Sequence, residues 1–167
     1  MRSDWLKTEE VAHVLAALQP PNRLACEVAL VTGLRISDVL QLRTQQLKQR
    51  FTIKEQKTGK PRRVYLPKDL LQRLERQAGQ RFVFEGRTNP KKHRTRQAVY
   101  KDIKRAAAVF PACRKLQVSP HTLRKAWAVD MLHETGDLAK VQRAMNHSDP
   151  CVTMIYALAD TIKKHKA

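Results

Sequence analysis

The stretch SPHTLR, residues 119–124, contains the sharpest helix start in the sequence. Ser119 is a preferred N-cap residue, and Pro120 suits the first helical position, where its missing N–H removes no hydrogen bond. His121 and Arg124 then lie three residues apart on one face of the first turn. Unpaired backbone N–H groups and the positive end of the helix dipole favour an anion there. The stretch predicts a helix that begins in an anion site, although an ordinary polar helix edge would have the same pattern.

Apolar residues at helical spacing predict that most of the chain is helical. There are only five glycines, and Gly33 is well placed to end one of the helices. Ser37 is predicted to cap a short helix, and Asp149-Pro150 to open the last one. The remaining helices are predicted over Thr8–Leu18, from Pro20-Pro21 to Gly33, over Lys68–Ala78, in the second half of Arg87–Arg105 and over Leu138–Met145.

The segment Arg50–Pro67 has a different pattern. Residues that favour β-strands lie on both sides of Thr58-Gly59, with Phe51 and Ile53 before it and Val64-Tyr65-Leu66 after it. This pattern predicts an antiparallel hairpin. Arg81–Phe84 is predicted to form a short extra strand. The expected fold class is therefore mainly α with a small antiparallel β-hairpin or sheet (α+β). The chain of 167 residues is expected to form one domain, with a basic C-terminal tail over residues 159–167.

The chain is strongly basic: 33 Lys and Arg residues against 15 Asp and Glu residues give a formal net charge of +18. This excess implies a polyanionic partner, with nucleic acid as the first candidate. A ribosomal protein or a binder of anionic membranes would show the same balance. The N-terminus lacks the apolar core of a secretory signal, and no stretch approaches membrane-spanning length. A cytoplasmic location without a membrane partner is expected.

The three cysteines, Cys26, Cys113 and Cys151, form neither a CxxC pair nor a cluster with histidines. Such a sparse, odd count favours a reducing compartment over a disulfide framework or a zinc site. Carboxylates are not clustered either, whereas two-metal nucleases need acidic ligands. We therefore expect no metal and no cofactor.

Two residues near Gly33 are candidates for a phosphate site. Arg35 could bind a phosphate through two parallel N–H donors, which a lysine could not reproduce. An exposed charge at a helix junction is the alternative interpretation. Asp38 could orient a neighbouring basic side chain, or it could be a first-turn carboxylate stabilised by the helix dipole.

The hairpin offers Lys57, beside the Thr58-Gly59 turn. An ammonium at a hairpin tip could enter a DNA groove and deliver a proton near a scissile phosphate. A lysine that solubilises the turn is the alternative, and Lys60 and Arg62 are rival candidates.

Near the C-terminus, Tyr156 follows His147 by nine residues, which is about 13 Å along a continuous helix. The Asp149-Pro150 break must therefore redirect the chain if both side chains are to reach one phosphate. An ordinary core aromatic with its hydroxyl at the rim is the alternative for Tyr156.

The segment Arg87–Arg105 carries eight Lys or Arg residues and one acid, Asp102. It is either a phosphate-contacting face or a solvated basic loop. The residues predicted to contact DNA are Lys60, Arg62, Lys91, Lys92, Arg94, Arg96 and Lys125.

Four motifs together resemble the catalytic domain of the tyrosine recombinases, the phage integrase family. They are TGLRISD at residues 32–38, QKTGKPRRVYLP at 56–67, SPHTLR at 119–124, and HSD followed by TMIY within 147–156. The resemblance spans nearly the whole chain. The catalytic residues that it implies are Arg35, Lys57, His121, Arg124, His147 and Tyr156, with Asp38 in support.

The resemblance implies a mechanism without metal, ATP or cofactor. Tyr156 attacks the scissile phosphate, forms a 3′-phosphotyrosyl link and releases a 5′-hydroxyl; a second 5′-hydroxyl then reverses the step. Arg35 and Arg124 stabilise the developing charge. Lys57 is the acid for the leaving oxygen, His121 the acid/base toward the tyrosyl oxygen, and His147 a hydrogen-bond donor to the phosphate. The implied partner is double-stranded DNA, bound by a homo-tetramer on paired sites, with a monomer as the free form.

The sequence departs from the family pattern at three places. Lys125 stands where many members carry histidine, and Asn146 where a glycine usually precedes the late histidine. No N-terminal core-binding domain, which would complete a clamp around DNA, is expected in this chain. The alternatives are a DNA-binding regulator that does not cut, a type IB topoisomerase and a ribosome-type RNA binder.

Overall fold

The computed structural model describes residue 6 and residues 8–145. The helices are α1 (Thr8–Ala16), α2 (Pro20–Thr32), α3 (Ile36–Leu40), α4 (Lys68–Gln77), α5 (Arg96–Val109), α6 (Pro111–Arg114), α7 (Pro120–Thr135) and α8 (Leu138–Met145). A 3-10 turn covers Thr44–Gln46, and the strands are β1 (Arg50–Lys54) and β2 (Pro61–Tyr65). The predicted fold class, mainly α with a small antiparallel sheet, is confirmed.

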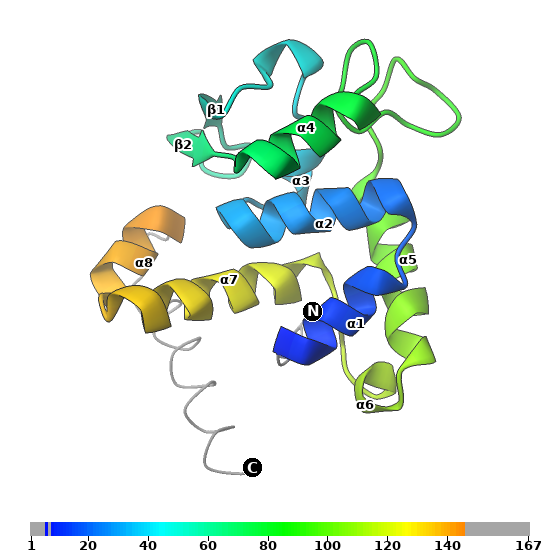
Figure 1. Cartoon of the computed structure of the whole chain (residues 1–167), viewed down its shortest axis with the longest axis vertical. Helices are drawn as coiled ribbons and strands as arrows, with labels where there is room; N and C mark the ends of the chain where they lie inside the picture. The colour runs from blue at the N-terminus through cyan, green and yellow to red at the C-terminus, as the bar shows by residue number, and fades with distance from the viewer. Residues whose placement is uncertain (1–5, 7, 146–167) are drawn as a thin grey trace.

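Helix α2 is the centre of the fold (Figure 1). It packs against α7, and α1, α3 and α4 also contact it. Its apolar residues recur at helical spacing, and Ala25, Cys26 and Val28 are fully buried. A smaller apolar cluster joins α7 to α8 through Val129, Val141 and their neighbours. Among the described residues, none of the helices combines the length and the apolar character needed to cross a bilayer.

The predicted hairpin is confirmed. Strand β1 pairs antiparallel with β2, with Phe51 opposite Val64 and Ile53 opposite Arg62. Ile53 and Val64 are buried, so one face of the sheet packs on the core. Gly59 adopts the left-handed conformation in the turn, with φ of 65°. Residues 56–60 of the turn are exposed or half-buried, while Glu55 before them is buried.

Helix α7 begins as its sequence predicts. The Ser119 hydroxyl oxygen accepts a hydrogen bond from the His121 backbone N–H at 3.2 Å. In return, the Ser119 N–H donates to the hydroxyl oxygen of Thr122 at 3.1 Å. The helix ends before Gly136, whose φ is 63°. Helix α8 has the bounds that were predicted for it.

The basic segment that begins at Arg87 is helical in its second half, as predicted. Helix α5 starts after Thr95, whose side chain accepts a hydrogen bond from the Ala98 N–H at 3.1 Å. The buried carboxylate of Asp102 accepts a hydrogen bond from the Gln19 N–H at 2.9 Å, just before α2. Asp102 therefore ties α5 to the start of the central helix.

Two structural predictions are wrong. Ser37 does not cap α3, because the chain is extended at Arg35, which is the N-cap residue, and Ser37 lies inside the helix. Arg81–Phe84 does not form a strand, because Phe82 makes only an isolated β-bridge with Arg43. Phe82, Val83 and Phe84 are all buried in succession, so this run anchors a loop to the core. The short helix α6 was not anticipated.

Candidate active site

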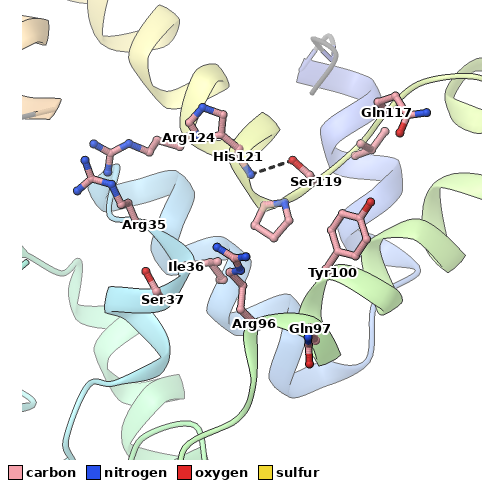
Figure 2. Close-up of a pocket in the computed structure, with 12 residues that line it drawn as sticks. Arg35, Ile36, Ser37, Arg96, Gln97, Tyr100, Gln117, Ser119, His121 and Arg124 are labelled. Carbon is pink, nitrogen blue, oxygen red and sulfur yellow. Dashed lines mark hydrogen bonds between the residues drawn. The ribbon is translucent and has the colours of Figure 1, made fainter. Parts of the chain in front are cut away.

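A cavity of about 400 Å³ opens where α3, α5 and α7 begin (Figure 2). Arg35 lines it from the start of α3, Arg96 from the first turn of α5, and His121 and Arg124 from the first turns of α7. The N-terminal ends of α5 and α7, which are the positive ends of their helix dipoles, lie at this cavity. Cationic side chains and two helix N-termini therefore surround one concave site, which suits a phosphate.

Arg35 reaches this cavity because the backbone turns sharply before it. Gly33 ends α2 with φ of 64°, and its α-carbon lies so close to the ring of Trp127 that a Cβ atom would be 2.4 Å from it. The Arg35 Nη1 donates to Oε2 of Glu55 at 3.0 Å. Its side chain is 20% exposed, so the guanidinium keeps access to the cavity.

Arg124 is buried, with 2% of its surface exposed. Its Nη1 donates to the carbonyl oxygen of Gly33 at 2.6 Å, and its Nη2 to that of Met145 at 2.7 Å. The same side chain lines the cavity (Figure 2). Arg124 therefore joins the end of α2 to the end of α8 and presents a fixed charge to the site.

His121 is a residue of the cavity whose pKa is strongly lowered. Desolvation, followed by the positive charges of Lys125, Arg124, Arg35 and Lys57, lowers its pKa to about 4. The residue as a whole is exposed, so solvent screens each of these effects, but desolvation and charge act in the same direction. His121 is therefore neutral at pH 7 and can accept a proton.

Lys57 is an exposed residue of the hairpin turn. Its charge is among those that lower the pKa of His121, so the turn is close enough to act on the cavity electrostatically. Lys60, the rival in the same turn, is also exposed.

Asp38 is 5% exposed, and the charges of Arg35 and Arg124 act on its carboxyl. Its Oδ1 accepts a hydrogen bond from the Gln56 N–H at 3.0 Å. Its buried Oδ2 has no hydrogen-bond partner among the residues that the structure describes. Desolvation raises the pKa of this carboxyl, and the neighbouring charge of Glu55 adds to that rise. Asp38 therefore connects the Arg35 helix to the hairpin turn.

Glu55 is the main residue that the sequence analysis missed. It is fully buried and accepts hydrogen bonds from Arg35, Thr58 and Arg62. The strand pattern could have indicated that Glu55 points inward. Residues two apart in a strand face the same side, and Glu55 follows the inward Ile53 by two positions. Tyr100, which lines the cavity from α5, was also missed.

Arg62 does not face DNA as predicted. It is 9% exposed, and its guanidinium is paired with Glu55 and donates to the Thr32 carbonyl oxygen at 2.6 Å. Its guanidinium also lies 5.6 Å from the centre of the Trp127 ring. This prediction is wrong because Arg62 is on the inward face of β2, next to Val64.

The other predicted DNA-contacting residues remain predictions. Lys60, Lys91, Lys92 and Arg96 are exposed, and Arg94 and Lys125 are half-buried. His147 and Tyr156 lie outside the described residues, as does Cys151. Cys26 and Cys113 are buried free thiols. The described part of the chain contains no group of three His, Cys, Asp or Glu side chains that could hold a metal ion.

The chain is similar to several known proteins. Residues 4–162 match the model of the phage integrase family. The chain is 32% identical over 156 residues to the probable integrase/recombinase YoeC of Bacillus subtilis, covering 90% of this chain and 84% of that protein. It is 32% identical over 152 residues to the tyrosine recombinase XerD of Lacticaseibacillus casei, covering 81% of this chain but 49% of that one.

A likeness to solved structures gives the same fold. The XerH site-specific recombinase in a post-cleavage complex with its palindromic difH substrate superposes with a TM-score of 0.75 at 23% identity. The match covers 98% of this chain and 52% of the XerH chain. The chain thus spans about half the length of XerD and XerH.

Proposed function

The chain belongs to the phage integrase family, and from that premise we propose that it cuts and rejoins DNA strands at specific sites through a covalent 3′-phosphotyrosyl intermediate. The observation that carries this proposal is one cavity lined by Arg35, His121 and Arg124. These residues come from motifs 86 or more positions apart, since Arg35 and His121 are separated by 121 − 35 = 86 residues. A fold that gathers them around a cationic cavity supports phosphate chemistry.

The arginines would bind the non-bridging oxygens of the scissile phosphate. Arg35 retains N–H donors beyond the one it gives to Glu55, and Arg124 is fixed by its bonds to two carbonyl oxygens. Donors that are already in place cost no reorganisation when negative charge develops. Together they would stabilise the pentavalent transition state.

The proton transfers follow from the charges at the site. The Tyr156 oxygen would attack phosphorus in line while the bond from phosphorus to the 5′-oxygen breaks. His121, neutral at pH 7, would take the phenolic proton, and Lys57 would supply a proton to the departing 5′-oxygen. His147 would donate a hydrogen bond to the phosphate. Attack by another 5′-hydroxyl reverses each transfer and rejoins the strand without ATP or metal.

The proposed partner is double-stranded DNA, in keeping with the net charge of +18. We place residues 1–167 in the family's catalytic domain, acting in the cytoplasm. Strand exchange between two duplexes needs two protomers on each, so the active form would be a homo-tetramer on paired sites. A monomer would be the free form. A regulator that binds without cutting would make no use of the transition-state arrangement of the cavity, so we do not favour it.

Covalent capture tests the proposal. The unaltered chain is incubated with a pool of nicked duplexes of random sequence, and DNA that stays attached in boiling detergent is recovered and sequenced. We expect an adduct on a defined site, and none from Tyr156→Phe. Relaxation of supercoiled plasmid without paired sites would indicate a topoisomerase instead. An adduct from Tyr156→Phe, or none from the unaltered chain, would contradict the proposal.

A further inference from the structure

The carboxylate of Glu55 is fully buried between two guanidiniums. Its Oε2 accepts a hydrogen bond from Arg35 Nη1 at 3.0 Å, and its Oε1 accepts one from Arg62 Nη1 at 3.2 Å. A buried carboxylate is stable only when charges and hydrogen bonds compensate its lost hydration. Both guanidiniums are therefore constrained by the position of Glu55.

The same carboxylate belongs to the turn that carries Lys57. Oε2 also accepts a hydrogen bond from the Thr58 hydroxyl at 2.8 Å. The backbone carbonyl oxygen of Glu55 accepts a hydrogen bond from the Gly59 N–H at 2.9 Å. The backbone N–H of Glu55 donates to the Lys60 carbonyl oxygen at 3.0 Å. Lys57 thus lies between two residues whose side chains are joined to each other. Glu55 therefore links the turn to Arg35, which lines the cavity.

The turn is anchored from its other side by Arg62. This side chain donates to the Thr32 carbonyl oxygen at 2.6 Å, immediately before Gly33, and lies over the Trp127 ring of α7. Arg62 thereby fixes the Glu55 carboxylate relative to α2 and α7. Arg35, in contrast, is partly exposed, so we expect its side chain to move when its carboxylate partner is removed.

We propose that Glu55 is a positioning residue: it acts through Arg35, holding that guanidinium in the orientation that binds the scissile phosphate, with Arg62 as its fixed support. This inference rests on the proposed function and adds a residue to it. A displacement of about 1 Å at a phosphate ligand can cost about 10²-fold in rate. We therefore expect Glu55→Gln, whose amide group cannot accept from Arg35 and Arg62 at once through two carboxylate oxygens, to slow cleavage by about that factor at saturating DNA.

Two modified substrates show which group Glu55 acts through. The probe is the duplex recovered from the covalent-capture pool, made with a methylphosphonate at the scissile position. It lacks one non-bridging negative charge, so cleavage depends less on Arg35. The second duplex carries sulfur in place of the 5′-bridging oxygen, and its thiolate leaves without a proton from Lys57. Cleavage rates are measured for the unaltered chain, Arg35→Ala and Glu55→Gln on the ordinary duplex and on both modified ones.

Glu27→Gln is the matched control. Glu27 is also shared by two arginines, with Arg23 at 2.9 Å and Arg73 at 2.6 Å, but it lies on α2 outside the cavity. This variant tests the loss of a bridging carboxylate as such, and we expect it to cleave like the unaltered chain. Chemical unfolding of both glutamine variants shows how much of each stays folded in the assay.

If Glu55 acts through Arg35, the cleavage rate of Glu55→Gln should respond to the modified duplexes in the same way as that of Arg35→Ala. The loss of rate in Glu55→Gln should shrink to within a few-fold on the methylphosphonate and persist on the sulfur-bridged duplex. An equal loss on all three duplexes, a loss that vanishes only on the sulfur-bridged duplex, or an unchanged rate on the ordinary one would overturn the inference. If the unaltered chain forms no adduct, the proposed function fails and this inference fails with it.

Discussion

The Nη1 group of Arg124 donates a 2.6 Å hydrogen bond to the carbonyl oxygen of Gly33. The residue that supplies a charge from α7 is thereby bonded to the glycine that turns the chain toward Arg35. A second bond, to the Met145 carbonyl oxygen, extends the link to the end of α8. One buried guanidinium thus joins α7 to the end of α2 and to the end of α8.

Arg124→Lys should therefore unfold more easily as well as cleave poorly. A lysine keeps the charge but cannot donate to both carbonyl oxygens in this planar geometry. A buried acceptor left without a donor costs about 1–3 kcal/mol, so we expect a loss of at least about that size in the free energy of unfolding. Urea unfolding followed by circular dichroism measures it. A midpoint equal to that of the unaltered chain would show that neither bond contributes.

That expectation changes how a cleavage assay must be designed. From the sequence, Arg124 is expected to act on the transition state, so that its removal abolishes cleavage and spares duplex binding. Its burial adds a stability effect that would imitate a catalytic one. Binding and cleavage should be compared at a temperature at which the variant is folded. Equal loss of both under those conditions would refute the transition-state role.

Gly33→Ala should damage both the fold and the site. An alanine in the left-handed conformation costs about 1–2 kcal/mol. Its Cβ would also lie 2.4 Å from the Trp127 ring, and such overpacking adds about 1–3 kcal/mol. Gly136→Ala is the matched control, because Gly136 has the same backbone conformation with φ of 63° and nothing within 4 Å of the added atom. Thermal unfolding should show a clearly larger drop for Gly33→Ala; equal drops would mean that the ring moves away freely.

Local signals explain what the sequence predicted correctly. Ser119-Pro120 and Gly136 define the bounds of α7 because caps and left-handed stops act within a few residues. The Thr58-Gly59 turn works in the same way for the hairpin. Where a residue's role depends on a partner far along the chain, prediction failed. Arg62 is paired with a carbonyl thirty positions away, which no local pattern reveals.

Glu55 and Ser37 show two further limits. The alternation from Ile53 places Glu55 inward, but a buried carboxylate is predicted only if its cationic partners are known. Ser37 is a good N-cap residue by type, yet the chain begins α3 after Arg35 because the left-handed Gly33 redirects the backbone there. The identities of Arg35, His121 and Arg124 could be predicted from motifs; their common cavity required the packing of α2 on α7.

His121 should titrate at low pH in the free protein and at higher pH when an anion is bound. Its pKa of about 4 reflects desolvation and neighbouring cations, and a bound phosphate offsets those charges, so the pKa should rise toward its ordinary value near 6.5. NMR titration of the ring with and without inorganic phosphate measures this change. The chemical shift of His133, near the other end of α7, should not respond to phosphate. An unchanged His121 titration would argue against an anion in the cavity.

The same shift predicts how stability depends on pH. The folded-state pKa lies below the unfolded value, so below pH 6.5 the unfolded chain binds this proton more readily. The contribution of His121 is therefore present above about pH 6.5 and is lost as the pH falls toward 4. His121→Gln should flatten the decline of the urea midpoint over that range. An identical decline in both proteins would assign it to other groups.

Asp38→Asn should cost little stability while impairing cleavage. Desolvation raises the pKa of Asp38, so burial works against its charged form. An asparagine keeps an oxygen for the Gln56 N–H and places an uncharged amide at the buried Oδ2. We expect a free energy of unfolding within about 1 kcal/mol of the unaltered value. Adduct formation should fall because the carboxylate no longer orients the basic groups beside it. A fully active variant would remove Asp38 from the site.

The exposed basic loop before α5 should contribute to DNA affinity without changing site choice. Lys91 and Lys92 are exposed and lie in the segment that leads to Arg96 at the cavity. If each contacts one phosphate, their joint replacement by glutamine lowers the slope of log affinity against log salt by about 1.8, at about 0.9 per phosphate. The matched control replaces Lys68 and Arg76, two cations of α4, a helix that contributes nothing to the lining of the cavity. Fluorescence anisotropy with a labelled duplex at several salt concentrations gives the slopes. Equal slopes for both double variants would show that the loop stays in solvent when DNA binds.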